Sequence, residues 1–272
     1  MKEALDGAIT AFTAAGLETP RLDAELLVAH VLGVGREQLY TDRDLRVVGA
    51  QVRPLQQAVH RRAVQREPLP YITGVRGFRH IELCVDERVL IPRPETELLV
   101  QIALALPAGS RVLDLGTGSG AVALALAQER PDLSVAGSDI SADALELARV
   151  NAERLGLEVD WLQADLLEGI ADEFDVILSN PPYVAEGERA CLAPEITRHE
   201  PPLALFAGSD GLAVIGPLIA QAAARSRLGT LAIEVGATQA DAVARLMADA
   251  GFGAVSRHRD LAGIERVIVG AR

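Results

Sequence analysis

The stretch that decides the fold reads Arg111-Val112-Leu113-Asp114-Leu115-Gly116-Thr117-Gly118-Ser119-Gly120-Ala121-Val122-Ala123. Its first five residues predict a buried strand, and the residues from Ala121 onward predict a helix. The glycines between them let the backbone turn tightly and approach a ligand at the helix N-terminus. A strand, a glycine-rich turn and a helix in this order are typical of a cofactor-binding α/β fold.

The sequence around this turn alternates between helical and strand patterns. Helices are predicted over residues 94–106, 119–129, 141–155, 211–225 and 238–250. Strands are predicted over 111–115, 133–138, 159–163, 175–179 and 229–235, with two closing strands near 253–258 and 264–269. This alternation predicts a mostly parallel, Rossmann-like sheet with helices on both faces, whose ligands bind beyond the carboxyl ends of the strands.

Residues 1–66 show helical periodicity alone, with one helix before Gly16, a second from Pro20 to Gly33 and a third over 50–66. We expect a small helical bundle. Prolines near residue 70 end the third helix, and a β-hairpin with a central Asp86-Glu87 turn is predicted next. The predicted domains are a helical substrate-recognition domain (1–72), a hairpin linker (73–92) and a catalytic domain (93–272).

Composition excludes several classes of function. The 272 residues carry a net charge of −12, and residues 1–79 hold 11 basic and 9 acidic side chains. The acidic remainder argues against a broad nucleic-acid surface. Lys2 is the only lysine, which excludes a phosphate-binding P-loop. Two unpaired cysteines and five scattered histidines give no metal site. The N-terminus does not resemble a secretory signal, and no apolar run could span a membrane, so a cytoplasmic protein is expected.

Acidic residues at strand ends point to the kind of cofactor. The glycine pattern alone also fits a dinucleotide, but Asp114 and the third glycine, Gly120, favour S-adenosylmethionine. Asp139 closes the second strand, where a carboxylate can accept both ribose hydroxyls; alternatively it caps the next helix, a role that Ser141 could fill. Asp165 with Leu166 would hold an adenine ring, or Asp165 could be a capping residue. The predicted cofactor-binding residues are Asp114, Gly116, Thr117, Gly118, Ser119, Gly120, Asp139, Asp165, Leu166 and Asn180.

The segment Asn180-Pro181-Pro182-Tyr183, directly after a strand, carries the predicted chemistry. An amide or aryl amine nitrogen is a poor nucleophile because its lone pair is delocalised. The Asn180 side-chain oxygen and the Pro181 carbonyl can accept its two N–H groups, the prolines stiffen the loop, and the Tyr183 ring can stack on the substrate. Catalysis would rest on orientation rather than on a strong base.

These motifs resemble those of the bacterial release factor glutamine N5-methyltransferases, a family of class I S-adenosylmethionine-dependent methyltransferases. The resemblance covers nearly the whole chain and includes residues 70–74, 91–97, 200–205, 208–212 and 260–267. The string Ile91-Pro92-Arg93-Pro94-Glu95-Thr96-Glu97 is its specific part. The resemblance implies methylation of the glutamine in the Gly-Gly-Gln loop of class 1 release factors. The implied substrate-binding residues are Asn180, Pro181, Pro182, Tyr183 and Arg93.

Three alternatives remain at this stage. An enzyme that methylates a base amine in RNA would use the same Asn-Pro-Pro-aromatic tetrad, whereas no room remains for a DNA-recognition domain. A non-catalytic cofactor-binding protein and a nicotinamide oxidoreductase are the others. In the helical part, Arg53, Arg61, Arg62 and Arg66 are predicted either to contact a protein partner or to form a solvated face.

Overall fold

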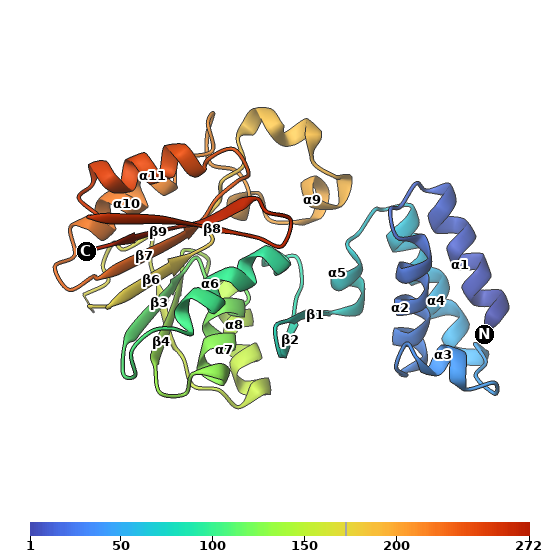
Figure 1. The fold of residues 1–272 in the computed structure, drawn as a ribbon. Coiled ribbons are helices and arrows are strands. Elements are labelled where there is room, and N and C mark those ends of the chain that lie inside the picture. Colours follow the sequence, from blue (N-terminus) through green and yellow to red (C-terminus); the bar gives the residue numbers. More distant parts are fainter. Residues whose placement is uncertain (172) are drawn as a thin grey trace. The chain divides into compact units, whose positions relative to one another are not determined.

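The computed structural model describes residues 1–171 and 173–272, which form two compact units (Figure 1). The helical unit comprises Met1–Gly74 and Ala193–His199. The sheet unit comprises Val75–Leu192 and Glu200–Arg272. The chain thus leaves the sheet unit after residue 192, contributes one short segment to the helical unit, and returns at residue 200.

Three helices build the core of the helical unit: α1 (Lys2–Ala14), α2 (Pro20–Leu32) and α4 (Val52–Ala63). They bury Phe12 and Leu27 completely. The three helices predicted from periodicity are therefore confirmed. The structure adds η1 (Gly49–Gln51), α3 (Gln38–Thr41) and α5 (Leu69–Thr73), which are too short to show a periodic pattern.

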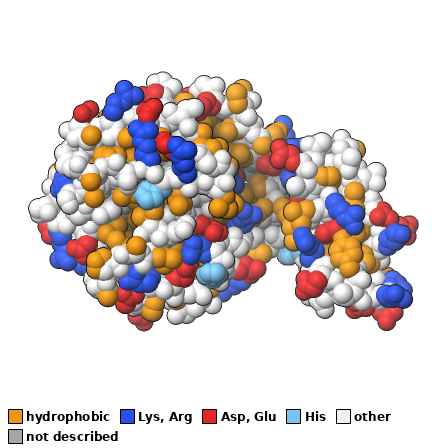
Figure 2. All heavy atoms as spheres, viewed as in Figure 1, with side chains coloured by type: hydrophobic (Ala, Val, Ile, Leu, Met, Phe, Trp, Pro, Cys, Tyr) orange, Lys and Arg blue, Asp and Glu red, His pale blue; other side chains and the backbone are white. Residues whose placement is uncertain are grey.

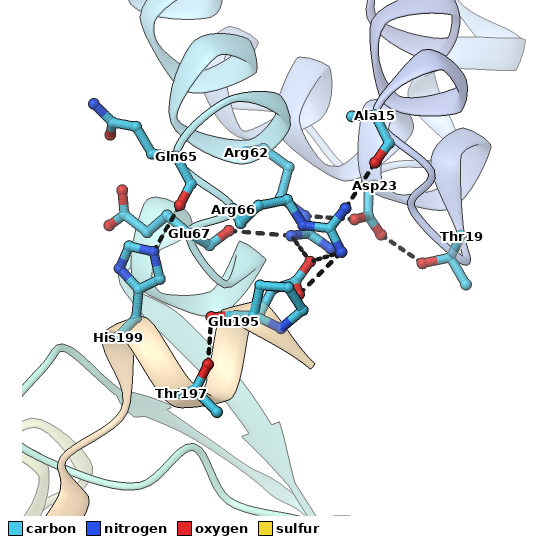
Figure 3. A network of polar contacts seen from close by, with 11 residues as sticks. Ala15, Thr19, Asp23, Arg62, Gln65, Arg66, Glu67, Glu195, Thr197 and His199 are labelled. Atoms are coloured by element: carbon cyan, nitrogen blue, oxygen red, sulfur yellow. Dashed lines mark hydrogen bonds and ion pairs between the residues drawn. The ribbon is translucent and has the colours of Figure 1, made fainter. Parts of the chain in front are cut away.

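The short segment after residue 192 that belongs to the helical unit contains α9 (Pro194–His199) (Figure 3). Its Glu195 carboxylate accepts a hydrogen bond from Arg62 at 2.8 Å and lies 2.8 Å from the guanidinium of Arg66. Arg62 also donates to Asp23 at 2.7 Å. The side chain of Arg62 is largely buried, so these carboxylates compensate its charge inside the unit.

This network corrects the expectation for the arginines of the third helix. Arg62 and Arg66 bind Glu195, and Arg61 pairs with Glu67. Arg62 and Arg66 thus have carboxylate partners inside the unit and are not merely solvated, whereas Arg61 is 41% exposed beside Glu67 and Arg53 is exposed. A run of charge on one helix cannot reveal acids that tertiary structure brings to it from another segment.

The hairpin consists of β1 (Val75–Phe78) and β2 (Ile81–Cys84), which pair antiparallel from Phe78 opposite Ile81. The hairpin turn therefore lies at Arg79 and His80. Asp86-Glu87 does form a turn, closed by the Val89 N–H donating to the Asp86 carbonyl, but this turn follows β2 and is not the centre of the hairpin as predicted. Arg79 adopts a left-handed backbone with φ of +49°. Its guanidinium pairs with Glu129, its backbone N–H donates to Glu97 at 3.0 Å, and no turn-forming residue type marks this position in the sequence.

Seven strands form the sheet in the order β5-β4-β3-β6-β7-β9-β8. All neighbouring strands are parallel except β9, which runs antiparallel to β7 and β8. The strands are β3 (Arg111–Leu115), β4 (Ser134–Asp139), β5 (Asp160–Gln163), β6 (Val176–Ser179), β7 (Thr230–Glu234), β8 (Ala254–Arg259) and β9 (Glu265–Ala271). Every strand predicted after residue 110 is present, so the mostly parallel sheet is confirmed.

Helices cover both faces of this sheet (Figure 1). Successive strand residues alternate between two cores: Val112 packs with α6, α7 and part of α8, whereas Leu113 packs with α10 and α11. The helices of the sheet unit are α6 (Glu97–Ala103), α7 (Ala121–Glu129), α8 (Ala142–Leu155), α10 (Ile215–Ala223) and α11 (Ala240–Asp249), with 3₁₀ turns η2 (Pro94–Thr96), η3 (Glu186–Cys191) and η4 (Pro202–Ala204).

Candidate active site

The loops that follow β3 and β6 lie next to each other, because the last residues of these strands, Leu115 and Ser179, are sheet partners. The strand order also reverses here, since β4 and β5 lie on one side of β3, and β6 and β7 on the other. Such a switch point opens a crevice beyond the strand ends. A Cβ added to Gly116 would lie only 3.9 Å from the carbonyl oxygen of Asn180.

The glycine-rich turn needs its glycines for two different reasons. Gly118 has a φ of +55°, in the left-handed region that side chains rarely adopt. Gly120 also has a positive φ, and a Cβ there would lie 3.0 Å from the ring of Trp161. Gly120 therefore permits close packing against β5, and it does not line the cavity described below.

Asp114 joins this turn to the following helix. Its carboxylate accepts the Thr117 hydroxyl at 2.6 Å and the Ala123 backbone N–H at 3.2 Å. The side chain is almost completely buried, and this burial raises the pKa of Asp114 to about 7. The two hydrogen bonds favour the charged form and only partly oppose the effect of burial.

Asp139 joins the end of β4 to the same turn. One carboxylate oxygen accepts the Gly118 N–H at 2.9 Å, and the other accepts the Ser141 N–H at 2.9 Å. Burial raises the pKa of Asp139, and the hydrogen bonds from backbone N–H groups oppose the shift. Ser141 caps α8 by accepting the Ala144 N–H, so the cap role considered for Asp139 belongs to Ser141.

Asp165 and Leu166 follow β5 at the same edge of the sheet. Leu166 has a φ of +52°, which is rare for a residue other than glycine. The next N–H, of Leu167, donates to the Gln221 side chain at 2.9 Å and helps to hold this backbone. Strain of this kind persists where the surrounding structure maintains it, and it often marks ligand sites.

Asn180 is anchored by its amide nitrogen. Nδ2 donates a hydrogen bond to the hydroxyl of Thr96 at 3.0 Å. Thr96 belongs to η2 and is buried. Nδ2 is thereby turned toward Thr96, so that the amide oxygen of Asn180 remains available as an acceptor.

Tyr183 is partly buried at the edge of the sheet unit's core. Its ring packs against the core beneath α10 and α11 and lies next to Gly236. Burial, assisted by nearby Glu234, raises the pKa of Tyr183 to about 12. The Gln239 amide donates to the Tyr183 carbonyl at 2.9 Å. Tyr183 does not line the cavity described below, and its stacking on the substrate stays a prediction.

A cavity of about 250 Å³ brings together most residues of the predicted site. The predicted residues in its wall are Arg93, Asp114, Gly116, Thr117, Gly118, Ser119, Asp139, Asp165, Leu166, Asn180, Pro181 and Pro182. Gly120 and Tyr183 are the two predicted residues outside this wall. Arg93 also binds the buried carboxylate of Glu200. Burial raises the pKa of Glu200, whereas Arg93 opposes the shift.

Sequence reasoning missed three residues of this region as contributors: Thr96, Glu234 and Gln239. Thr96 lies in the string that carries the family resemblance, but nothing local indicates its bond to Asn180. Glu234 ends β7 as Asp139 ends β4, so its place at a strand end was the available signal. Gln239 offers no such signal, because its contact with Tyr183 spans 56 positions.

Comparison with known proteins gives matches along nearly the whole chain. The PrmC N-terminal domain matches residues 3–74, and the methyltransferase small domain matches residues 94–200. A release factor glutamine methyltransferase of Deinococcus radiodurans is 40% identical over 98% of this chain and 97% of its own. One of Mycolicibacterium smegmatis is 42% identical over 100% and 98%.

The chain belongs to the release factor glutamine methyltransferase family. The expected family, the S-adenosylmethionine-dependent methyltransferase class and the class I fold are confirmed. A methyltransferase structure from Pyrococcus furiosus shares this fold with a TM-score of 0.53 and 17% identity, over 81% of this chain and 96% of the other. Within the described residues, no helix is long and apolar enough to cross a membrane.

Proposed function

We propose that this enzyme transfers a methyl group from S-adenosylmethionine to the side-chain amide nitrogen, N5, of the glutamine in the Gly-Gly-Gln motif of class 1 release factors. Family membership over nearly the full length carries the proposal. The position of Asn180 and Pro181 in the wall of the cavity supports it. A cytoplasmic location and the absence of a nucleic-acid target belong to the same proposal.

The cavity residues suit the proposed cofactor. The Asp139 carboxylate has lone pairs beyond those that accept its two N–H partners, and these can accept ribose hydroxyls. The left-handed Leu166 and its neighbour Asp165 offer an apolar side chain and a polar edge for a planar base. When bound, S-adenosylmethionine supplies a methyl group on a positively charged sulfur.

The protein's own contribution to methyl transfer comes from Asn180 and Pro181, which orient the substrate amide. The Asn180 side-chain oxygen and the Pro181 carbonyl oxygen can accept the two N–H groups of a carboxamide. Holding both hydrogens orients the amide nitrogen, whose lone pair is otherwise delocalised. Orientation and polar stabilisation of this kind are the main sources of rate enhancement where no strong base is needed.

The helical domain predicted over residues 1–72 is proposed to recognise the release factor. In the structure this unit exposes the large apolar side chains of Tyr40, Val48 and Val64. Figure 2 shows hydrophobic and basic side chains near one another on the visible face of this unit. Exposed apolar side chains rimmed by charge are common at protein interaction sites.

Labelled S-adenosylmethionine and a purified release factor test the proposal directly. Mass spectrometry should place the label on the glutamine of the Gly-Gly-Gln motif. The matched control is a release factor whose motif glutamine is replaced by glutamate, which should remain unlabelled. Label on a different residue, or on added RNA in preference to the protein, would contradict the proposal.

A further inference from the structure

Glu234 is a buried acid that the proposed chemistry does not yet use. It is the last residue of β7, and only 1% of its surface is exposed. Its Oε2 atom is buried and has no hydrogen-bond partner among the residues that the structure describes. Burial raises the pKa of Glu234 to about 7, while hydrogen bonding by Thr96 and Tyr183 opposes this shift. A buried acid without a full set of partners is costly and often marks a functional site.

Thr96 connects this acid to Asn180. Its hydroxyl oxygen already accepts the Nδ2–H of Asn180 at 3.0 Å. A hydroxyl has one proton to donate, and Thr96 is buried, so that proton needs an acceptor inside the protein. Glu234 is the neighbouring acceptor with which the Thr96 side chain interacts. Donation of this proton to Glu234 would continue the bond from Asn180 to Thr96 toward the buried carboxylate.

We propose that Glu234 is a positioning residue which, through Thr96, holds the Asn180 amide with its oxygen toward the substrate. The site then selects a carboxamide, which brings N–H donors, over a carboxylate, which brings only acceptors. This inference deepens the proposed function and rests on it. It assigns discrimination of glutamine from glutamate to a carboxylate that lies behind the cavity wall.

The opposite orientation of the Asn180 side-chain amide shows why Thr96 needs an anionic acceptor. If Thr96 had no acceptor behind it, its proton could be donated to the Asn180 oxygen instead. The Asn180 amide would then turn its N–H₂ group toward the substrate. That N–H₂ group would meet the N–H₂ group of a glutamine side chain, and two donors cannot form a hydrogen bond with each other. A glutamate side chain, which carries only acceptors, would then bind better than glutamine.

Tyr183 takes part in the same arrangement. Its side chain lies near Glu234 and contributes to lowering the pKa of that carboxyl group, and its carbonyl accepts a hydrogen bond from Gln239. A Cβ on Gly211 would lie 2.2 Å from this carbonyl, so the loop has little room to shift. Glu234 thereby interacts with side chains linked to both ends of the Asn180–Tyr183 segment.

The test compares E234Q, T96V and T96S with the exposed control E158Q. E234Q keeps the shape of the side chain but removes the obligate acceptor, and T96V removes the hydroxyl. We expect E234Q and T96V to lower kcat by about tenfold or more, the effect of losing about 1.4 kcal/mol of orientation. T96S keeps the hydroxyl and should retain most activity, and E158Q should match the wild type.

A binding measurement separates positioning from a general loss of structure. Release factors that carry glutamine or glutamate in the motif are titrated in the presence of S-adenosylhomocysteine. The preference for glutamine should fall about tenfold in E234Q and T96V, while S-adenosylhomocysteine affinity and melting temperature stay near those of E158Q. Unchanged discrimination in E234Q would overturn the inference. If the wild type itself fails to methylate glutamine, the proposed function fails instead.

A pH series of the same titration gives a second readout. Protonated Glu234 is no longer an obligate acceptor, so wild-type preference for glutamine should weaken as pH falls through about 7. Glu95, Arg266 and Tyr183 face this carboxyl group and do not need to titrate in this range for the effect. E234Q should show no such change with pH. If E234Q kept the same pH dependence as the wild type, the inference would also be overturned.

Discussion

The carboxylate of Asp139 accepts the backbone N–H of Gly118 at 2.9 Å and thereby joins the end of β4 to the turn after β3. The same side chain lines the cavity. Asp139 can therefore contribute to cofactor affinity in two ways, by shaping the glycine-rich turn and by accepting hydrogen bonds from a ligand. A substitution there should affect binding more than chemistry.

Asp139→Ala should raise the dissociation constant of S-adenosylmethionine by about tenfold to a hundredfold, the effect of losing a charge-assisted hydrogen bond of about 1.5–3 kcal/mol. Turnover at saturating cofactor should change much less. Calorimetry measures the affinity, and Asp139→Asn is the matched variant because it keeps one acceptor oxygen. Unchanged affinity in Asp139→Ala would mean that Asp139 only accepts the backbone N–H groups of Gly118 and Ser141 and does not bind the cofactor.

Asn180→Ala should lower turnover by about a hundredfold, because loss of one oriented polar group costs about 3 kcal/mol at comparable sites. Cofactor affinity should largely persist, since the glycine-rich turn and Asp139 remain. Single-turnover kinetics with a release factor and calorimetry with S-adenosylmethionine measure the two quantities separately. Near-normal turnover would show that Asn180 does not orient the substrate amide.

Sequence patterns predicted the positions of those site residues that lie at the ends of strands. Asp114, Asp139 and Asn180 each lie at or beside the end of a strand, and parallel strands place such ends at one edge of the sheet. Tyr183 follows the same strand as Asn180, yet its ring packs against the core. Its direction depends on the space beside Gly236 and on Gln239, which no local pattern records.

The remaining differences also come from contacts between distant segments. Glu195 meets Arg62 across 133 positions, so the sequence alone could not pair these charges. The hairpin turn lies at Arg79, which has a left-handed backbone and pairs with the distant Glu129, whereas the turn-forming residues at Asp86 make a separate turn after β2. Fold class follows from periodicity, whereas such pairings require the folded chain.

Glu195→Ala should destabilise the helical unit by roughly 1–3 kcal/mol, because it leaves the largely buried Arg62 with one carboxylate fewer. Hydrogen exchange of the α4 amides should be faster in this variant. Asp44→Ala, an exposed acid of the same unit, is the control and should change exchange little. Equal exchange in both variants would mean that α9 does not stabilise the unit.

Asp114→Asn should reduce the dependence of stability on pH between about 4 and 7. Burial raises the pKa of Asp114 from 3.8 to about 7, so the folded chain binds a proton that the unfolded chain has released. The stabilisation that this bound proton gives is fully present below pH 3.8, the pKa of Asp114 in the unfolded chain. It is lost as the pH rises to about 7. Each such group contributes up to about 1.4 kcal/mol per pH unit within that window.

Urea denaturation of the cofactor-free protein, followed by the fluorescence of the single Trp161 in the sheet unit, measures this effect. The free energy of unfolding should fall with rising pH more steeply in the wild type than in Asp114→Asn. Asp132→Asn is the control, because its ion pair with Arg130 lowers the pKa of that exposed acid and acts at lower pH. Equal slopes for the wild type and Asp114→Asn would show that Asp114 stays charged when buried, held by Thr117 and the Ala123 N–H.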